Sequence, residues 1–144
     1  MLDLKNGEIV LCQSGLKIDR YLTIDKLETD TDIELIKKKD VKTGYIWYSI
    51  WADVEENKYI QLSICFSVRN QKSKLCRVYI YPHIQKNNPI DAKMYFNNID
   101  KVSENVKIWF GKYCDTPRKV FSWGEVFNIH GDPNIDPSVV LMYK

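Results

Sequence analysis

The most regular pattern in the chain is an unbroken alternation of side-chain type between residues 59 and 68. The apolar positions are Ile60, Leu62, Ile64, Phe66 and Val68, and the positions between them are Tyr59, Gln61, Ser63, Cys65 and Ser67. Successive side chains of a β-strand point to opposite faces of the sheet, so a period of two is typical of a strand. The segment is therefore predicted to be a central strand with one aliphatic face.

Similar segments flank this strand on both sides. Residues 44–53 precede it across the turn-like residues 55–57, and residues 75–81 follow it after the polar residues 69–73. Short connections between strands favour antiparallel pairing of neighbours. The three segments are predicted to form an antiparallel meander.

The N-terminal part is less regular. Residues 8–12 form a short apolar run bounded by glycine and serine, which predicts a first strand, and residues 16–18 can extend it as a hairpin arm. Residues 23–27 fit a single helical turn, whereas residues 33–39 fit either a polar strand or a helix. The sequence leaves this choice open.

One amphipathic helix is clear in the C-terminal half. Apolar side chains recur at three- and four-residue spacing, at Ile99, Val102, Val106, Trp109, Phe110 and Tyr113. Asn98 or Asp100 can cap the start of this helix, and residues 115–117 can end it. Its apolar stripe is wide enough to cover part of a sheet.

Two strands are predicted to finish the chain, from residue 119 to about 129 and from 138 to 143, separated by the turn-rich residues 131–137. The first would place Phe121, Trp123, Phe127 and Ile129 on one side. Glu125 shares that parity, so it is expected to be partly buried beside Arg118, a lysine or a tyrosine hydroxyl, unless a bulge at Gly124 turns it outward.

Together these elements predict a single α+β domain over residues 1–144. Its main part is a largely antiparallel sheet of five to seven strands, with one principal amphipathic helix and room for a second short one. The length, 144 residues, suits one core.

Charge and targeting signals narrow the class of protein. The formal net charge is +2, from 21 basic and 19 acidic residues, which is too balanced for a protein that holds a nucleic-acid backbone. We find no signal-peptide pattern and no run of 18 apolar residues, so we expect a cytoplasmic protein with no membrane span. The four cysteines are dispersed without a CxxC pair, and we expect them to be reduced.

Motifs for catalysis or cofactor binding are missing. The two histidines, His83 and His130, lie at predicted strand ends, where a hydrolase could use one of them with Asp132, but no nucleophile motif accompanies them. Asp132 and Asp136 suit an ordinary turn better than a cation site, and no glycine-rich phosphate loop occurs. We therefore predict a non-enzymatic protein without metal or cofactor.

The meander raises a different question, because the face opposite its aliphatic side carries unusually large side chains. If Ile46, Tyr48 and Ile50 point into the core, the other face carries Tyr45, Trp47, Trp51, Tyr59, Arg77, Tyr79 and Tyr81. Tyrosine, tryptophan and arginine are the residues enriched at binding hot spots. Three interpretations stay open: a protein-binding surface, an interior layer covered by residues 23–39, or a platform on which single-stranded RNA stacks.

A family resemblance favours the first interpretation. The chain resembles small bacterial immunity proteins that are encoded beside contact-dependent growth inhibition or other polymorphic toxins. The segments that carry the resemblance are VFSWGEV (120–126), DP (132–133), SVVLMY (138–143), KIW (107–109), GEIV (7–10) and LTID (22–25). Membership implies a cytoplasmic protein that binds the C-terminal toxin domain of a sibling cell, commonly a nuclease, and blocks it without catalysis. It implies no particular contact residues.

Charge complicates this expectation, because inhibitors of basic nucleases are usually acidic. An acidic or neutral toxin would resolve the conflict, and so would a local acidic patch. Six carboxylates are candidates for such a patch, with a solvated loop rim as the alternative. They are Asp30, Asp32, Glu34, Asp53, Glu55 and Glu56.

The function predicted from the sequence is thus stoichiometric occlusion of a cognate toxin in bacterial competition. The predicted contacts are the aromatic side chains and Arg77, together with Asp53, Glu55 and Glu56. The alternative is a small-molecule or peptide-binding accessory domain in which the aromatic side chains line a pocket.

Overall fold

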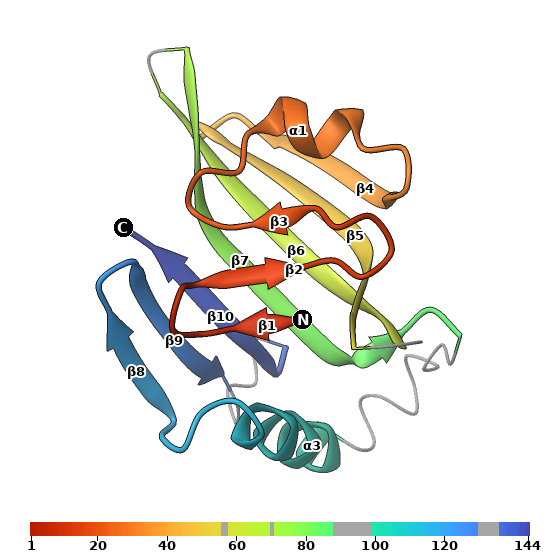
Figure 1. Cartoon of the computed structure of the whole chain (residues 1–144), viewed down its shortest axis with the longest axis vertical. Helices are drawn as coiled ribbons and strands as arrows, with labels where there is room; N and C mark the ends of the chain where they lie inside the picture. The colour runs from red at the N-terminus through yellow and green to blue at the C-terminus, as the bar shows by residue number, and fades with distance from the viewer. Residues whose placement is uncertain (56–57, 70, 88–98, 130–135) are drawn as a thin grey trace.

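A computed structural model describes residues 1–55, 58–69, 71–87, 99–129 and 136–144 of the chain (Figure 1). About half of these residues belong to a seven-stranded antiparallel sheet, and a smaller layer of N-terminal residues lies against one of its faces. The α+β class and the largely antiparallel sheet predicted from the sequence are confirmed.

The large sheet has the strand order β4-β5-β6-β7-β10-β9-β8. Its strands are β4 (Glu34–Val41), β5 (Tyr45–Glu55), β6 (Lys58–Arg69), β7 (Lys72–Gln85), β10 (Ser138–Tyr143), β9 (Gly124–Ile129) and β8 (Arg118–Phe121). Strands β5 to β7 form the predicted meander and β4 pairs with its outer strand β5. On the other side β10 pairs with β7, and the β8–β9 hairpin completes the sheet. Residues 34–41, which the sequence left between strand and helix, are the edge strand β4.

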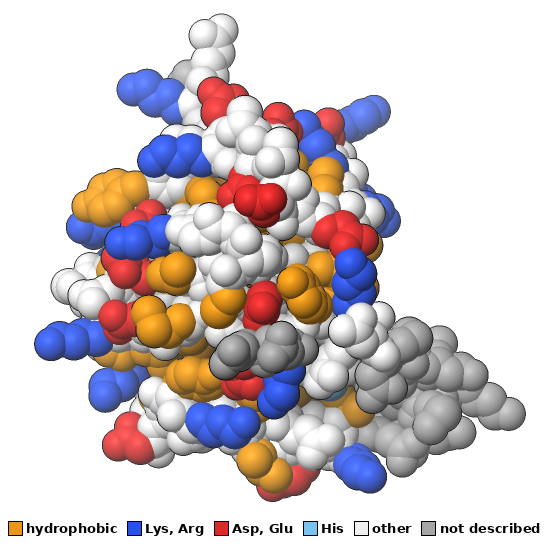
Figure 2. Space-filling view, turned by 45° about the vertical axis from the view of Figure 1, so that its right-hand side comes forward, with side chains coloured by type: hydrophobic (Ala, Val, Ile, Leu, Met, Phe, Trp, Pro, Cys, Tyr) orange, Lys and Arg blue, Asp and Glu red, His pale blue; other side chains and the backbone are white. Residues whose placement is uncertain are grey.

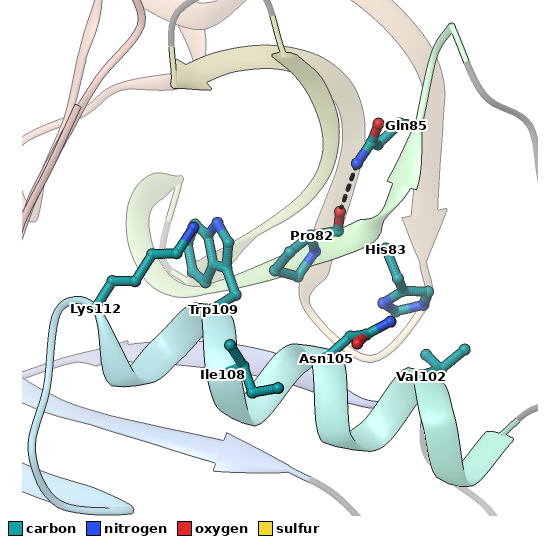
Figure 3. A pocket seen from close by; sticks show the side chains of 8 residues that line it. All are labelled: Pro82, His83, Gln85, Val102, Asn105, Ile108, Trp109 and Lys112. Atoms are coloured by element: carbon teal, nitrogen blue, oxygen red, sulfur yellow. Dashed lines mark hydrogen bonds between the residues drawn. The ribbon is translucent and has the colours of Figure 1, made fainter.

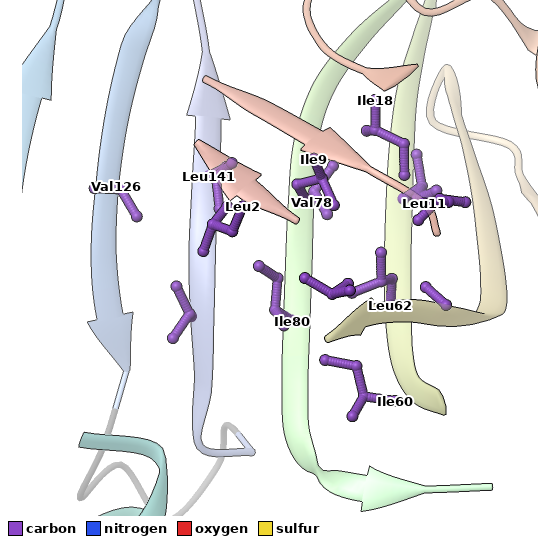
Figure 4. Close-up of a cluster of buried hydrophobic side chains, with 14 of the residues drawn as sticks. Leu2, Ile9, Leu11, Ile18, Ile60, Leu62, Val78, Ile80, Val126 and Leu141 are labelled. Atoms are coloured by element: carbon purple, nitrogen blue, oxygen red, sulfur yellow. The ribbon is translucent and has the colours of Figure 1, made fainter. Parts of the chain in front are cut away.

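The N-terminal layer covers the aliphatic face of this sheet. It consists of a small sheet of β1 (Leu2–Asp3), β2 (Glu8–Val10) and β3 (Lys17–Ile18), followed by the helix α1 (Ile24–Thr29), which Thr23 caps. Figure 4 shows the core between the two layers. The fully buried side chains there include Ile9, Leu11 and Ile18 from the small sheet and Leu62, Val78, Ile80, Val126 and Leu141 from the large one.

The helix α3 (Ile99–Gly111) is the predicted amphipathic helix, and it packs at one end of the sheet beside β7, β9 and β10. The helix buries its own side chains Val106 and Phe110 against the core. Glu55, at the end of β5, accepts hydrogen bonds of 2.9 Å from the Trp109 indole nitrogen and the Tyr113 hydroxyl. These bonds fasten the helix to the sheet.

The prediction for residues 119–129 was wrong in one respect. Instead of one strand, the segment is a β-hairpin of two strands, β8 and β9. The two residues Ser122 and Trp123 form the turn between them. The turn breaks the alternation, so Trp123 is buried against the N-terminal layer while Glu125 lies on the opposite face. There Glu125 accepts hydrogen bonds from Arg118 at 2.8 and 2.6 Å, the partner predicted for it.

A buried contact around Gly7 joins the N-terminal layer to the C-terminal hairpin. The Trp123 indole donates to the Leu4 carbonyl at 2.9 Å, and the Tyr143 hydroxyl donates to the Gly7 carbonyl at 3.1 Å. Gly7 has a φ of +67°, and a Cβ there would lie 2.3 Å from the Trp123 ring. Only glycine fits both the backbone conformation and the space.

We therefore expect Gly7→Ala to lower the free energy of unfolding by about 3 kcal/mol, since it combines left-handed backbone strain with overpacking. Gly15→Ala is the matched control, because Gly15 has a similar φ of +74° but open space around it. In urea denaturation, the free energy of unfolding of the control should fall by only about 1 kcal/mol. Equal losses in the two variants would show that the Trp123 contact has no role.

Candidate functional site

The face of the large sheet opposite the core, called here the open face, carries the aromatic side chains that strand parity predicts to lie together. Strand pairing aligns Trp47 with Cys65 and Arg77, Ser49 with Ser63 and Tyr79, and Trp51 with Gln61 and Tyr81. Tyr45 and Tyr59 complete the set. The side chains of all seven predicted contact residues on this face are half-buried.

Residues 23–39 do not cover this face. Helix α1 lies over the aliphatic side, where Leu27 is buried in the core and Glu28 accepts a hydrogen bond from the Tyr48 hydroxyl. The remainder of the segment continues into β4, which extends the edge of the sheet instead of crossing it. The segment that could have sealed the aromatic side chains is therefore used elsewhere.

Three of the aromatic rings form a strip, with Trp47 of β5 in contact with Tyr79 of β7 and Tyr79 in contact with Tyr81. The Trp47 and Tyr79 ring centroids are 5.7 Å apart, and the Tyr79 and Tyr81 rings are nearly parallel with centroids 6.4 Å apart. Ser49 and Ser63 face each other with their hydroxyl oxygens 3.5 Å apart. Serine is smaller than the aromatic residues around this pair. The aromatic rings therefore stand higher on the surface than the two serines.

Basic groups surround the strip. Lys39 pairs with Trp47, Lys37 with Ser49, Lys74 with Ser67 and Arg77 with Cys65, so all four belong to the open face. Within the described residues no carboxylate lies in ion-pair distance of any of them. Among the described carboxylates near this face, Glu34 pairs with Lys86 and Glu125 with Arg118, while Asp136 lies near Tyr81.

The acidic patch expected from the sequence does not form as predicted. Asp53 is only 8% exposed, because residues 12 and 13 of the N-terminal layer hydrogen-bond to the β5 backbone at its end. Glu55 is engaged by Trp109, Tyr113 and Lys58, and Glu34 forms an ion pair with Lys86.

The rest of the acidic set is small. Asp30 and Asp32 lie together near the start of β4, where the Asp30 carboxylate accepts a hydrogen bond from the Asp32 backbone at 3.0 Å. Glu56 is outside the described residues. The side that carries the N-terminal layer shows acidic and basic side chains interspersed (Figure 2).

Sequence reasoning missed a hollow between α1 and β4 on the covered side. Its volume is about 250 Å³, and its lining is Leu27, Glu28, Asp30, Ile33, Leu35, Tyr48 and Ile50. The Lys38 ammonium lies 2.9 Å from the Glu28 carboxylate at its rim. Burial, followed by the hydrogen bond to Glu28, raises the pKa of Tyr48 to about 12. The hydroxyl therefore stays protonated at neutral pH.

A second hollow, of about 390 Å³, lies between the end of β7 and helix α3 (Figure 3). His83 and Pro82 face Asn105, Ile108 and Trp109 across it. Burial lowers the pKa of His83 to about 4, and the nearby charge of Asp136 opposes this shift only in part. The imidazole is neutral at pH 7. The described lining contains no hydroxyl, thiol or carboxylate that His83 could activate.

The buried imidazole predicts a pH dependence of stability. The unfolded chain binds a proton at His83 near pH 6.5, whereas the folded chain binds it near pH 4. The unfolded state thus holds more protons between these values, so stability falls as the pH falls through this window. Urea denaturation at pH 7, 6 and 5 measures the free energy of unfolding. As the pH falls, this free energy should decrease less steeply in His83→Gln than in the parent. Identical slopes would mean that His83 titrates normally in the folded chain.

Metal and membrane features are absent from the described part of the chain. No three histidine, cysteine or acidic side chains gather there as a metal site would need. None of the described helices combines the length and apolarity needed to cross a bilayer. Asp132 and His130 lie outside the described residues.

Known proteins give no further guide to the site. No family model matches the chain, and neither a curated protein nor a solved structure matches it. The open face is the candidate functional site on geometry alone. It combines aromatic rings with basic side chains that have no carboxylate partner among the described residues.

Proposed function

We propose that the protein is a cytoplasmic immunity protein, which docks its open face on a cognate bacterial toxin domain and neutralises that domain by stoichiometric occlusion. The observation that carries the proposal is that the described N-terminal layer lies against only one face of the sheet. The N-terminal layer seals the aliphatic face, while Trp47, Trp51 and Tyr79 remain partly accessible on the other. The resemblance of residues 120–126 and 138–143 to immunity proteins supports the same function.

The composition of the face favours a protein partner. Aromatic rings and arginine supply large contact areas that lose little side-chain entropy on binding, which is why they dominate hot spots. The half of the face on β9 and β10 carries the half-buried Phe127, Ile129 and Met142, which offer neither charge nor hydrogen bonds to a nucleic acid. A surface that combines both halves fits a folded domain better than a phosphate backbone.

The charges of the face indicate the chemistry of that partner. Lys37, Lys39, Lys74 and Arg77 have no described carboxylate to neutralise them, so the face presents a positive potential. Complementary charges accelerate encounter and suppress wrong partners. We infer that the toxin surface which docks here is acidic. Of the two resolutions of the charge conflict that the sequence offered, this inference takes the acidic toxin and not the local acidic patch.

The hot-spot test uses the toxin fragment encoded immediately upstream. Co-expression should yield a complex, and Trp47→Ala combined with Tyr79→Ala should weaken it at least 30-fold, which corresponds to about 2 kcal/mol. Tyr21→Ala is the control, because Tyr21 is 67% exposed on the N-terminal layer. Circular dichroism and urea denaturation check that the variants are folded. Failure to form any complex, or a folded double variant that binds as tightly as the parent, would contradict the proposal.

The charge test compares two substitutions of equal charge change. Lys39→Glu on the open face should slow association with the toxin about tenfold at low salt, and added salt should reduce the difference. Lys26→Glu, on helix α1, should leave the rate nearly unchanged. Faster association of the Lys39 variant would indicate a basic partner surface. Salt-sensitive binding of single-stranded oligonucleotides by the parent, lost in both open-face variants, would instead indicate a nucleic-acid platform.

The alternative function, small-molecule binding, is favoured by one observation, the apolar hollow between α1 and β4. It would use this covered side, since the aromatic side chains form an open surface and do not line a pocket. A ligand in the hollow should raise the melting temperature. Leu35→Trp, at a rim position that is 49% exposed, should abolish that rise without affecting a complex at the open face.

A further inference from the structure

An irregularity in strand pairing places two cysteines side by side on the open face. Cys65 of β6 pairs with Arg77 of β7, and the next residue, Phe66, pairs with Leu75. Cys76 is therefore an extra residue on β7, which is the arrangement of a β-bulge. Its thiol donates a hydrogen bond of 3.2 Å to the Cys65 carbonyl oxygen. Both cysteines are free thiols, with Cys65 buried and Cys76 half-buried.

We propose that Cys65 and Cys76 form a reactive dithiol, which is oxidised by low-molecular-weight disulfides to an intramolecular disulfide between β6 and β7. The bulge brings the two sulfurs to one position in adjacent strands, and the partial exposure of Cys76 gives a small oxidant access to one of them. This inference does not depend on the proposed function, because it concerns only the chemistry of the pair.

The surroundings assign different roles to the two thiols. The Cys76 thiolate accepts a hydrogen bond from the Cys65 thiol and lies near the Arg77 guanidinium, and these interactions outweigh burial and lower the pKa of Cys76 to about 7. The same hydrogen bond, together with burial, raises the pKa of Cys65. Cys76 is therefore the attacking nucleophile near neutral pH, and Cys65 is the resolving thiol.

The reaction proceeds by two exchanges. The Cys76 thiolate attacks one sulfur of the external disulfide, whose sulfur–sulfur bond breaks, and one thiolate leaves with the electron pair. Cys65 then gives its proton to that thiolate and attacks the Cys76 sulfur, which expels the second thiolate. Solvent returns to the second thiolate the proton that Cys76 had lost. The net change oxidises two protein thiols to one disulfide and reduces the external disulfide to two thiols.

Oxidised glutathione is the probe for this reaction, applied to the whole chain with all four cysteines. After incubation at pH 7.5, free thiols are alkylated, and peptide mapping without reduction locates each modification. We expect one cross-linked peptide pair joining Cys65 to Cys76, with Cys114 alkylated only after unfolding. Cys12 is exposed and is expected to carry at most a glutathione adduct.

Two single variants separate the steps. Cys65→Ser should accumulate a stable glutathione adduct on Cys76, because the resolving thiol is missing, and Cys76→Ser should give neither adduct nor cross-link at Cys65. The rate of the first exchange in the parent should reach half its maximum near pH 7. A persistent adduct on Cys76 in the parent would overturn the proposal. So would no modification of Cys76 under conditions that modify Cys12.

Discussion

The structure depends on one constraint: a seven-stranded sheet has two faces, and the described N-terminal layer lies against only one of them. The N-terminal layer can bury the aliphatic face because alternate apolar side chains of the layer, such as Ile9 and Leu11, are fully buried in the core between the two sheets. The contact of Gly7 with Trp123 and Tyr143 fixes the position of that layer. A sheet of this kind usually leaves a polar second face in water.

Here the second face is aromatic and basic, and the difference is a physical indication of function. Large apolar surface left in water contributes nothing to folding, but it becomes favourable when a partner covers it. The rings of Trp47 and Tyr79 already contact each other, so they are ordered before a partner arrives and lose little freedom on binding. The basic groups beside them add selectivity, since they would repel a partner of like charge.

The sequence predicted what depends on periodicity and missed what depends on irregularity. The unbroken alternation of β6 defined the core face, the strand neighbours and the shared face of the aromatic side chains. The hairpin turn at Trp123 and the end of β5 broke the alternation. Parity alone therefore misplaced Trp123 and could not show that Asp53 is enclosed by residues 12 and 13. Long-range contacts of this kind leave no local pattern.

The bulge at Cys76 is another irregularity, and it changes the chemistry of a side chain as well as its position. A regular register would pair Cys76 with Phe66 and turn its side chain away from Cys65, so the two thiols would lie on opposite faces of the sheet. One extra residue in β7 brings Cys76 beside Cys65 and Arg77 on the open face. The Cys65 thiol and the Arg77 guanidinium both lower the pKa of Cys76. A single irregularity in strand pairing places both of them beside Cys76. The proposed reactive pair and the proposed docking surface share a face because strands β6 and β7 contribute to both.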